Sequence, residues 1–175
     1  MNNNRFSVLI GMVFIAFASR LIPHPPNFTP IAALALFGGA SFADKRAALL
    51  VPLCGLFFSD LVLGFYAAMP VVYGSFALVV CIGFGLRQRQ TIWRIGGATV
   101  GAAALFFVLS NFGEWALGAI YPRTLNGLVD CFVAAIPFFR NTILGDLMYS
   151  AVLFGGLSFA EHRWPSLAEA TPTAT

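Results

Sequence analysis

Long apolar runs separated by short polar segments cover most of the chain. A helix needs about 20 mostly apolar residues to cross the hydrocarbon core of a bilayer. The pattern therefore predicts a six-helix transmembrane bundle, in which the second span is short and contains Gly38-Gly39. The predicted spans are residues 6–22, 31–43, 47–66, 71–86, 95–112 and 141–160.

The first apolar run also resembles a secretory signal. Arg5 precedes it, and Ala16-Phe17-Ala18 is similar to a cleavage site. Because every later run is of membrane length as well, we expect the first run to be an uncleaved helix.

The segment 113–140 does not fit the simple pattern. Residues 125–139 are apolar enough for a short helix, but they include Asp130 and are followed by Arg140. We expect an amphipathic or re-entrant segment on the outer side of the membrane. The alternative is a seventh span, which would place the C-terminus outside.

The composition supports a membrane protein. Of the 175 residues, 59% are hydrophobic and 10% are charged, against roughly 45–50% and 25% in soluble domains. This excludes an ordinary soluble protein, and the low charge excludes an intrinsically disordered one. We expect a single all-α transmembrane domain in contact with membrane lipid at residues 1–163, followed by a disordered polar tail at residues 164–175.

The distribution of basic residues predicts the orientation. They lie in short clusters between apolar runs and form no stripe, so we expect no nucleic-acid partner. Because basic loops stay in the cytoplasm, both termini are predicted to be cytoplasmic. With six spans, the inner side carries Arg5, Lys45, Arg46, Arg87, Arg89, Arg94 and Arg163, and the outer side carries Arg20, Arg123 and Arg140.

Polar residues collect near the predicted outer ends of the spans. Ionisable residues inside membrane spans cost about 2.5–3.5 kcal/mol each on insertion scales, so they are candidates for function. One interpretation is structural, with Arg140 pairing with Asp60 or Asp146 to lock helices together. The other is that these residues line an outward-facing pocket beside the stiff, proline-rich loop at residues 23–30. The candidate binding residues are His24, Asn27, Asp60, Tyr66, Tyr73, Asn111, Tyr121, Arg140, Asn141 and Asp146.

Several enzyme classes lack their sequence motifs. The chain has no phosphate-binding loop, no His-Glu-x-x-His and no Gly-x-Ser-x-Gly. Cys54, Cys81 and Cys131 lie in apolar sequence without metal-ligand spacing, and each is first interpreted as a small buried hydrophobe. A bound metal would therefore arrive inside a cofactor.

Six short spans with both termini inside, a structured first outer loop, a long outer segment before the last span and polar residues at the outer face resemble the substrate-binding S components of energy-coupling-factor (ECF) vitamin transporters. Three stretches, at residues 23–39, 59–64 and 136–146, are also similar to a group of small bacterial membrane proteins near that superfamily. The resemblance implies a protein of the bacterial inner membrane that binds a vitamin-like small molecule. Its partner would be an energising module, or none if the chain resembles the solitary members.

Among the solitary members, the chain most resembles cobalamin transporters of the BtuM type. That resemblance implies cobalamin as the substrate, with a cysteine thiolate on cobalt. Cys81 is the preferred ligand and Cys131 the second. A donating thiolate weakens the group bound on the opposite face of cobalt, so Cys81 is also a candidate catalytic residue for removing cyanide. Whether the chain is an enzyme as well as a transporter stays open.

Other functions remain open beside cobalamin uptake. The chain could bind another vitamin or small molecule, or it could be a membrane assembly or scaffold protein whose outer polar residues only pair helices. A membrane enzyme acting on lipid or quinone ranks last, because no nucleophile and base stand together in the sequence.

Overall fold

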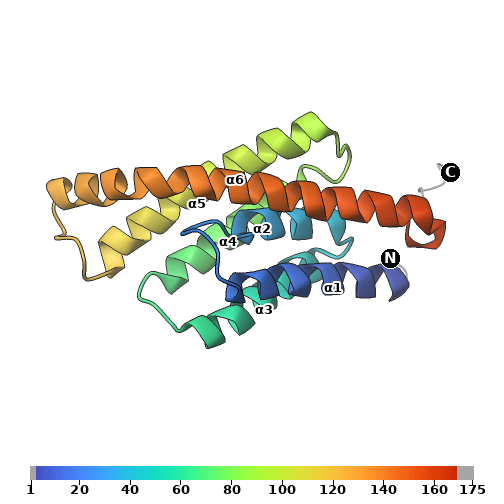
Figure 1. Cartoon of the computed structure of the whole chain (residues 1–175), viewed down its shortest axis with the longest axis horizontal. Helices are drawn as coiled ribbons and strands as arrows, with labels where there is room; N and C mark the ends of the chain where they lie inside the picture. Colours follow the sequence, from blue (N-terminus) through green and yellow to red (C-terminus); the bar gives the residue numbers. More distant parts are fainter. Residues whose placement is uncertain (1–2, 169–175) are drawn as a thin grey trace.

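The computed structural model describes residues 3–168, which form helices joined by loops and contain no strand. Successive helices run in opposite directions, so the two ends of the described chain lie at the same end of the molecule (Figure 1). The α-helices are α1 (Asn3–Ala18), α2 (Ile31–Ser41), α3 (Lys45–Leu63), α4 (Met69–Phe84), α5 (Ile92–Leu117) and α6 (Leu125–Arg163), with the 3-10 turns η1 (Ser19–Leu21) and η2 (Pro165–Leu167).

Four helical segments of the described chain are long and apolar enough to cross a membrane. They are Asn3–Leu21, Lys45–Leu63, Ile92–Leu117 and Leu125–Arg163. Helices α2 and α4 are shorter, with 11 and 16 residues. The prediction of an all-α protein is therefore confirmed, together with apolar helices of membrane-spanning length.

Helix α2 forms the centre of the bundle. Every residue from Ala32 to Ser41 is buried, and α2 contacts each of the other five helices. Its 11 residues span only about 16 Å. Glycines bring its backbone against α4, because a Cβ atom on Gly39 would collide with the carbonyl oxygen of Val80. Small residues that allow such close approach are typical of helix contacts in membranes.

Other segments satisfy the backbone groups at both ends of α2. At its C-terminal end, the Arg87 guanidinium donates to the carbonyl oxygens of Gly39 and Phe42 at 2.8 and 2.7 Å. At its N-terminal end, the backbone N–H of Ala33 donates to the Asp146 carboxylate of α6 at 2.9 Å. Residue Pro30, at the N-cap position, supplies no side-chain cap of its own. These contacts satisfy terminal groups that have no partner inside the helix.

The expectation of a separate outer segment at residues 125–139 is wrong. Helix α6 continues without interruption from Leu125 to Arg163 and includes Pro137. Both charged residues that suggested a break, Asp130 and Arg140, are exposed on the helix surface, where they do not disturb it. The 39 residues of α6 extend roughly 58 Å, so α5 and α6 project together beyond the other helices (Figure 1).

Regular structure continues past the predicted domain boundary at Arg163. Residues Pro165–Leu167 form η2, and Leu167 is buried. Arg5 of α1 pairs with Glu161 of α6 and also donates to the carbonyl oxygen of Leu167 at 2.8 Å. These contacts join α1 to the end of α6 and to η2. The rest of the predicted polar tail, residues 169–175, lies outside the described residues.

Candidate functional site

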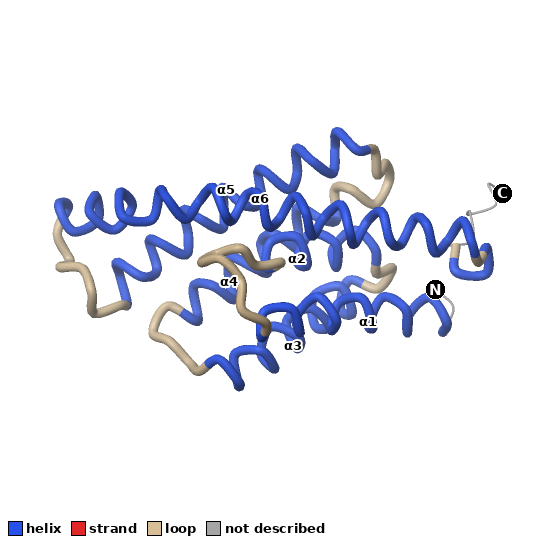
Figure 2. Tube along the Cα trace, viewed as in Figure 1, coloured by secondary structure: helices blue, strands red, loops and turns tan. Residues whose placement is uncertain are grey.

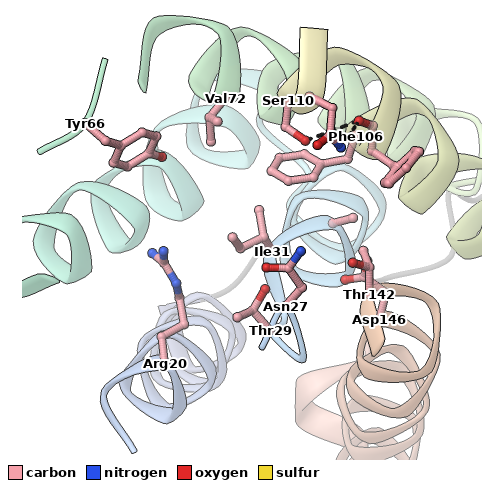
Figure 3. Close-up of a pocket in the computed structure, with 13 residues that line it drawn as sticks. Arg20, Asn27, Thr29, Ile31, Tyr66, Val72, Phe106, Ser110, Thr142 and Asp146 are labelled. Atoms are coloured by element: carbon pink, nitrogen blue, oxygen red, sulfur yellow. Dashed lines mark hydrogen bonds between the residues drawn. The ribbon is translucent and has the colours of Figure 1, made fainter. Parts of the chain in front are cut away.

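A polar cavity of about 260 Å³ lies where the loop at residues 22–30 meets α5 and α6 (Figure 3). Side chains from η1, two loops, α2, α4, α5 and α6 reach it. Apolar walls include Ile31, Val72 and Phe106. The polar lining residues are Arg20, Asn27, Thr29, Tyr66, Ser110, Asn111, Thr142 and Asp146.

A buried ion pair holds Arg20 at one side of the cavity. Its Nη1 donates to Oδ1 of Asp60 at 3.0 Å and also to the hydroxyl of Ser59. The second carboxylate oxygen of Asp60 accepts a hydrogen bond from the hydroxyl of Tyr73 at 3.0 Å. Asp60 is 1% exposed, so these donors satisfy a carboxylate that would otherwise be buried without hydrogen bonds.

The prediction that Arg140 pairs with Asp60 or Asp146 is wrong. Asp60 pairs with Arg20, whereas Arg140 is exposed. Asp146 accepts from the backbone of α2. Arg140 lies on the exposed surface of a continuous α6, whereas both carboxylates are buried.

The hydrogen bonds of Arg20 leave part of its guanidinium unused. The Arg20 side chain is 9% exposed, and both of its hydrogen bonds within residues 3–168 come from Nη1. Its Nε is buried and has no hydrogen-bond partner in that range. A buried donor without a partner carries a desolvation cost of about 1–3 kcal/mol.

Asp146 enters the cavity from another side (Figure 3). Its carboxylate is buried at the N-terminus of α2, where it accepts from one of the N–H groups that have no partner inside the helix. The neighbouring Gly145 lets the loop approach, because a Cβ atom there would lie 3.2 Å from the backbone nitrogen of Thr29. Asp146 therefore joins α6 to the N-terminus of α2, and Gly145 beside it lets the loop pack against α6.

The loop at residues 22–30 folds back over the bundle (Figure 2). Asn141 of α6 tethers it by donating to the carbonyl oxygen of Pro26 at 3.0 Å. Asn27 adopts a left-handed backbone conformation with φ of 61°, which asparagine tolerates better than most residues. The side chain of Asn27 thereby lines the cavity. His24 is exposed, and its Nδ1 lies 2.7 Å from the carbonyl oxygen of Ile22 in the same loop.

Tyr66 closes the cavity from the turn between α3 and α4, where Gly64 has a φ of 98°. Partial burial, aided by the negative charge of Asp60 and opposed by Arg20, raises the pKa of Tyr66 to about 12. Its hydroxyl therefore stays protonated at physiological pH. It offers a neutral donor and acceptor to a bound molecule.

The cysteines lie outside this lining. Cys81 is exposed on α4, in a shallow groove with Lys45 and Arg46 at the α3 N-terminus. Cys131 is buried on α6, and its Sγ donates to the carbonyl oxygen of Asn111 at 3.4 Å. Cys54 is exposed. Within residues 3–168, no group of three or more His, Cys, Asp or Glu residues could hold a metal ion.

The structure brings together part of the predicted site. Asn27, Tyr66, Asn111 and Asp146 line the cavity. Asp60 is bonded directly to Arg20, Tyr73 donates to Asp60, and Asn141 supports the loop. Asp60, Tyr73 and Asn141 do not line the cavity themselves, and neither do the remaining predicted residues, His24, Tyr121, Arg140, Cys81 and Cys131.

Among the polar lining residues, sequence reasoning missed Arg20, Thr29, Ser110 and Thr142. Two of them carried a signal. Arg20 is a basic residue at the outer end of the first apolar run, directly before the proline-rich loop. Thr142 lies four residues before Asp146, on the same face of a helix.

The comparisons with known proteins give a family but no function. Residues 1–167 match a protein family described as a family of unknown function (DUF6580). No curated protein and no solved structure matches the chain.

Proposed function

The chain belongs to the DUF6580 family, whose function is unknown, and we propose that it captures a small polar molecule in this cavity for uptake across a bacterial inner membrane. The role is that of an S component of an ECF vitamin transporter, working with an energising module or alone. In this proposal six helices form the transmembrane bundle, both termini are cytoplasmic, and the cavity opens to the outside.

The observation that carries the proposal is the convergence of polar side chains on one cavity. Arg20, Asn27, Ser110 and Asp146 come from four different segments, yet all of them reach it. Polar side chains in an apolar bundle cost free energy unless they have partners. A small-molecule site, by contrast, combines apolar walls with a few convergent polar groups.

The cavity volume favours a compact ligand. About 260 Å³ is near the lower end of the roughly 300–1,000 Å³ typical of small-molecule pockets. Cobalamin, with its corrin macrocycle and attached nucleotide, stays a prediction from the sequence, and the cavity lining includes none of the cysteines. We therefore propose a vitamin-like molecule smaller than a corrinoid.

A scaffold role is the alternative. It would explain the Arg20–Asp60 pair and the Asp146 contact as devices that join helices. It would not explain a buried Nε of Arg20 without a partner beside an open cavity. The two functions differ in whether a small molecule binds.

The test is mass spectrometry of small molecules that co-purify with the protein in mild detergent. Ser110→Trp would fill the cavity, because Ser110 lines it. Val108→Trp is the matched control, since Val108 lies on the same helix and is 49% exposed. We expect a bound molecule in the unmodified protein and in V108W, and its loss in S110W. Cells should then accumulate the identified molecule only with variants that retain it.

Two results together would contradict the proposal. One is a gently purified preparation that carries no small molecule. The other is an S110W variant that matches V108W in bound content and in cellular accumulation of every compound tested.

A further inference from the structure

Part of the Arg20 guanidinium beside the cavity has no hydrogen-bond partner within the described residues. This matters for the chemical class of the ligand, and the inference rests on the proposed function. Buried polar groups in proteins are nearly always hydrogen-bonded. A buried group that lacks a partner within the protein itself therefore indicates what a ligand supplies.

The two carboxylates at the cavity already have donors. Asp60 accepts from Arg20 and from the hydroxyl of Tyr73. Asp146 accepts from the N–H of Ala33 at the positive end of the α2 dipole. Neither carboxylate requires a cation from the ligand.

Arg20 is in the opposite situation. A guanidinium has five N–H donors arranged in a planar fork. Both hydrogen bonds of Arg20 within the described chain use Nη1, and Nε is buried without a partner. The Asp60 pair leaves the Nε side of the guanidinium available, and Figure 3 shows Arg20 directed toward the cavity.

We infer that the ligand carries a carboxylate, which binds the Nε side of the Arg20 guanidinium. A carboxylate supplies two acceptor oxygens that match the guanidinium fork. The rest of the molecule lies against the Phe106 ring and the polar groups of Asn27 and Ser110. The ligand class is thus a compact organic acid.

The experiment compares acids with neutral amides of the same shape, by calorimetric titration of the full chain in detergent. The probes are benzoate against benzamide and pentanoate against pentanamide. An ion pair with Arg20 should make the Kd of each acid lower than that of its amide by roughly tenfold or more. We expect at least one acid to bind the unmodified protein that much more tightly than its amide.

Arg20→Lys keeps a positive charge near Asp60 but removes the planar fork. We expect it to weaken binding of the acid by about tenfold and to leave amide binding unchanged. Arg123→Lys is the control, because Arg123 is exposed in the loop between α5 and α6. If Arg20→Lys fails to fold, the ratio of acid to amide affinity in the unmodified protein decides the question.

The possible results separate this inference from the proposed function. Equal binding of acid and amide overturns the carboxylate inference, while a binding cavity and the uptake function stand. Absence of binding by every acid also overturns it. The proposed function is then decided independently by the comparison of S110W with V108W.

Discussion

Replacement of Asp146 tests whether this buried carboxylate caps α2. The N–H of Ala33 donates to it at 2.9 Å, and Pro30 at the N-cap position offers no side-chain acceptor. Asp146→Ala would leave the N-terminus of a fully buried helix without that acceptor. Asp146→Asn would keep an acceptor oxygen but lose the negative charge.

The magnitude follows from the bond that is removed. Loss of an N-cap acceptor costs about 0.5–2 kcal/mol, and a buried N–H left unpaired costs about 1–3 kcal/mol. Both figures describe the same hydrogen bond, so we expect Asp146→Ala to lower the free energy of unfolding by about 2 kcal/mol. For Asp146→Asn we expect about 1 kcal/mol or less, the value of a charge at a helix terminus.

The assay is thermal unfolding in mild detergent, followed by tryptophan fluorescence. For a chain of this size, about 1 kcal/mol corresponds to roughly 2–4 °C in Tm. Asp146→Ala should therefore lower Tm by roughly 4–8 °C. Asp130→Ala is the control, because Asp130 is exposed on the same helix. The reasoning is refuted if the alanine variants at both positions have the same Tm, or if Asp146→Asn is as destabilising as Asp146→Ala.

Three further predictions address packing, ionisation and the cysteine. Gly39→Ala should destabilise the protein by about 1–3 kcal/mol, because its Cβ would collide with Val80. Gly74→Ala, in open space on α4, should not be destabilising in this way. Thermal unfolding of both variants checks this prediction, and equal Tm values would contradict it. Ultraviolet titration should show the phenol of Tyr66, whose pKa is raised to about 12, ionising well above the ordinary tyrosine pKa of about 10. Tyr66→Phe should remove that late step, and loss of a step near the ordinary tyrosine pKa of about 10 instead would be the contrary result. Cys81→Ala should leave the amount of co-purifying ligand, measured by mass spectrometry, unchanged, since Cys81 lies outside the cavity. A bound corrinoid whose absorption spectrum changes in this variant would instead support the cobalamin prediction.

The helices were predictable because hydropathy records burial in lipid or protein. The predicted runs recovered the helix order, and the short second run became the fully buried α2. The continuity of α6 near residue 140 was not predictable from charge alone. Exposed Asp130 and Arg140 are tolerated on a long helix when they point away from the bundle, and sequence does not show that direction.

The site was only partly predictable for a related reason. The position of Asp146 and Asn111 near the ends of apolar runs indicated a shared polar region, and both line the cavity. The partner of Asp60 depends on how α1 packs against α3, which no local pattern specifies. The choice of Arg20 over Arg140 is therefore a tertiary property.

The two capped ends of α2 have a consequence for biosynthesis. Ribosomes make α2 early, but the Arg87 guanidinium that satisfies its last carbonyls comes from a turn made later. The carboxylate at its first turn belongs to α6, the last long helix to emerge. An 11-residue helix is also too short to be retained in the bilayer on its own. The hydrogen bonds at both ends of α2 can therefore all be in place only when translation is nearly complete, and a protein truncated before α6 would lack the acceptor at its first turn.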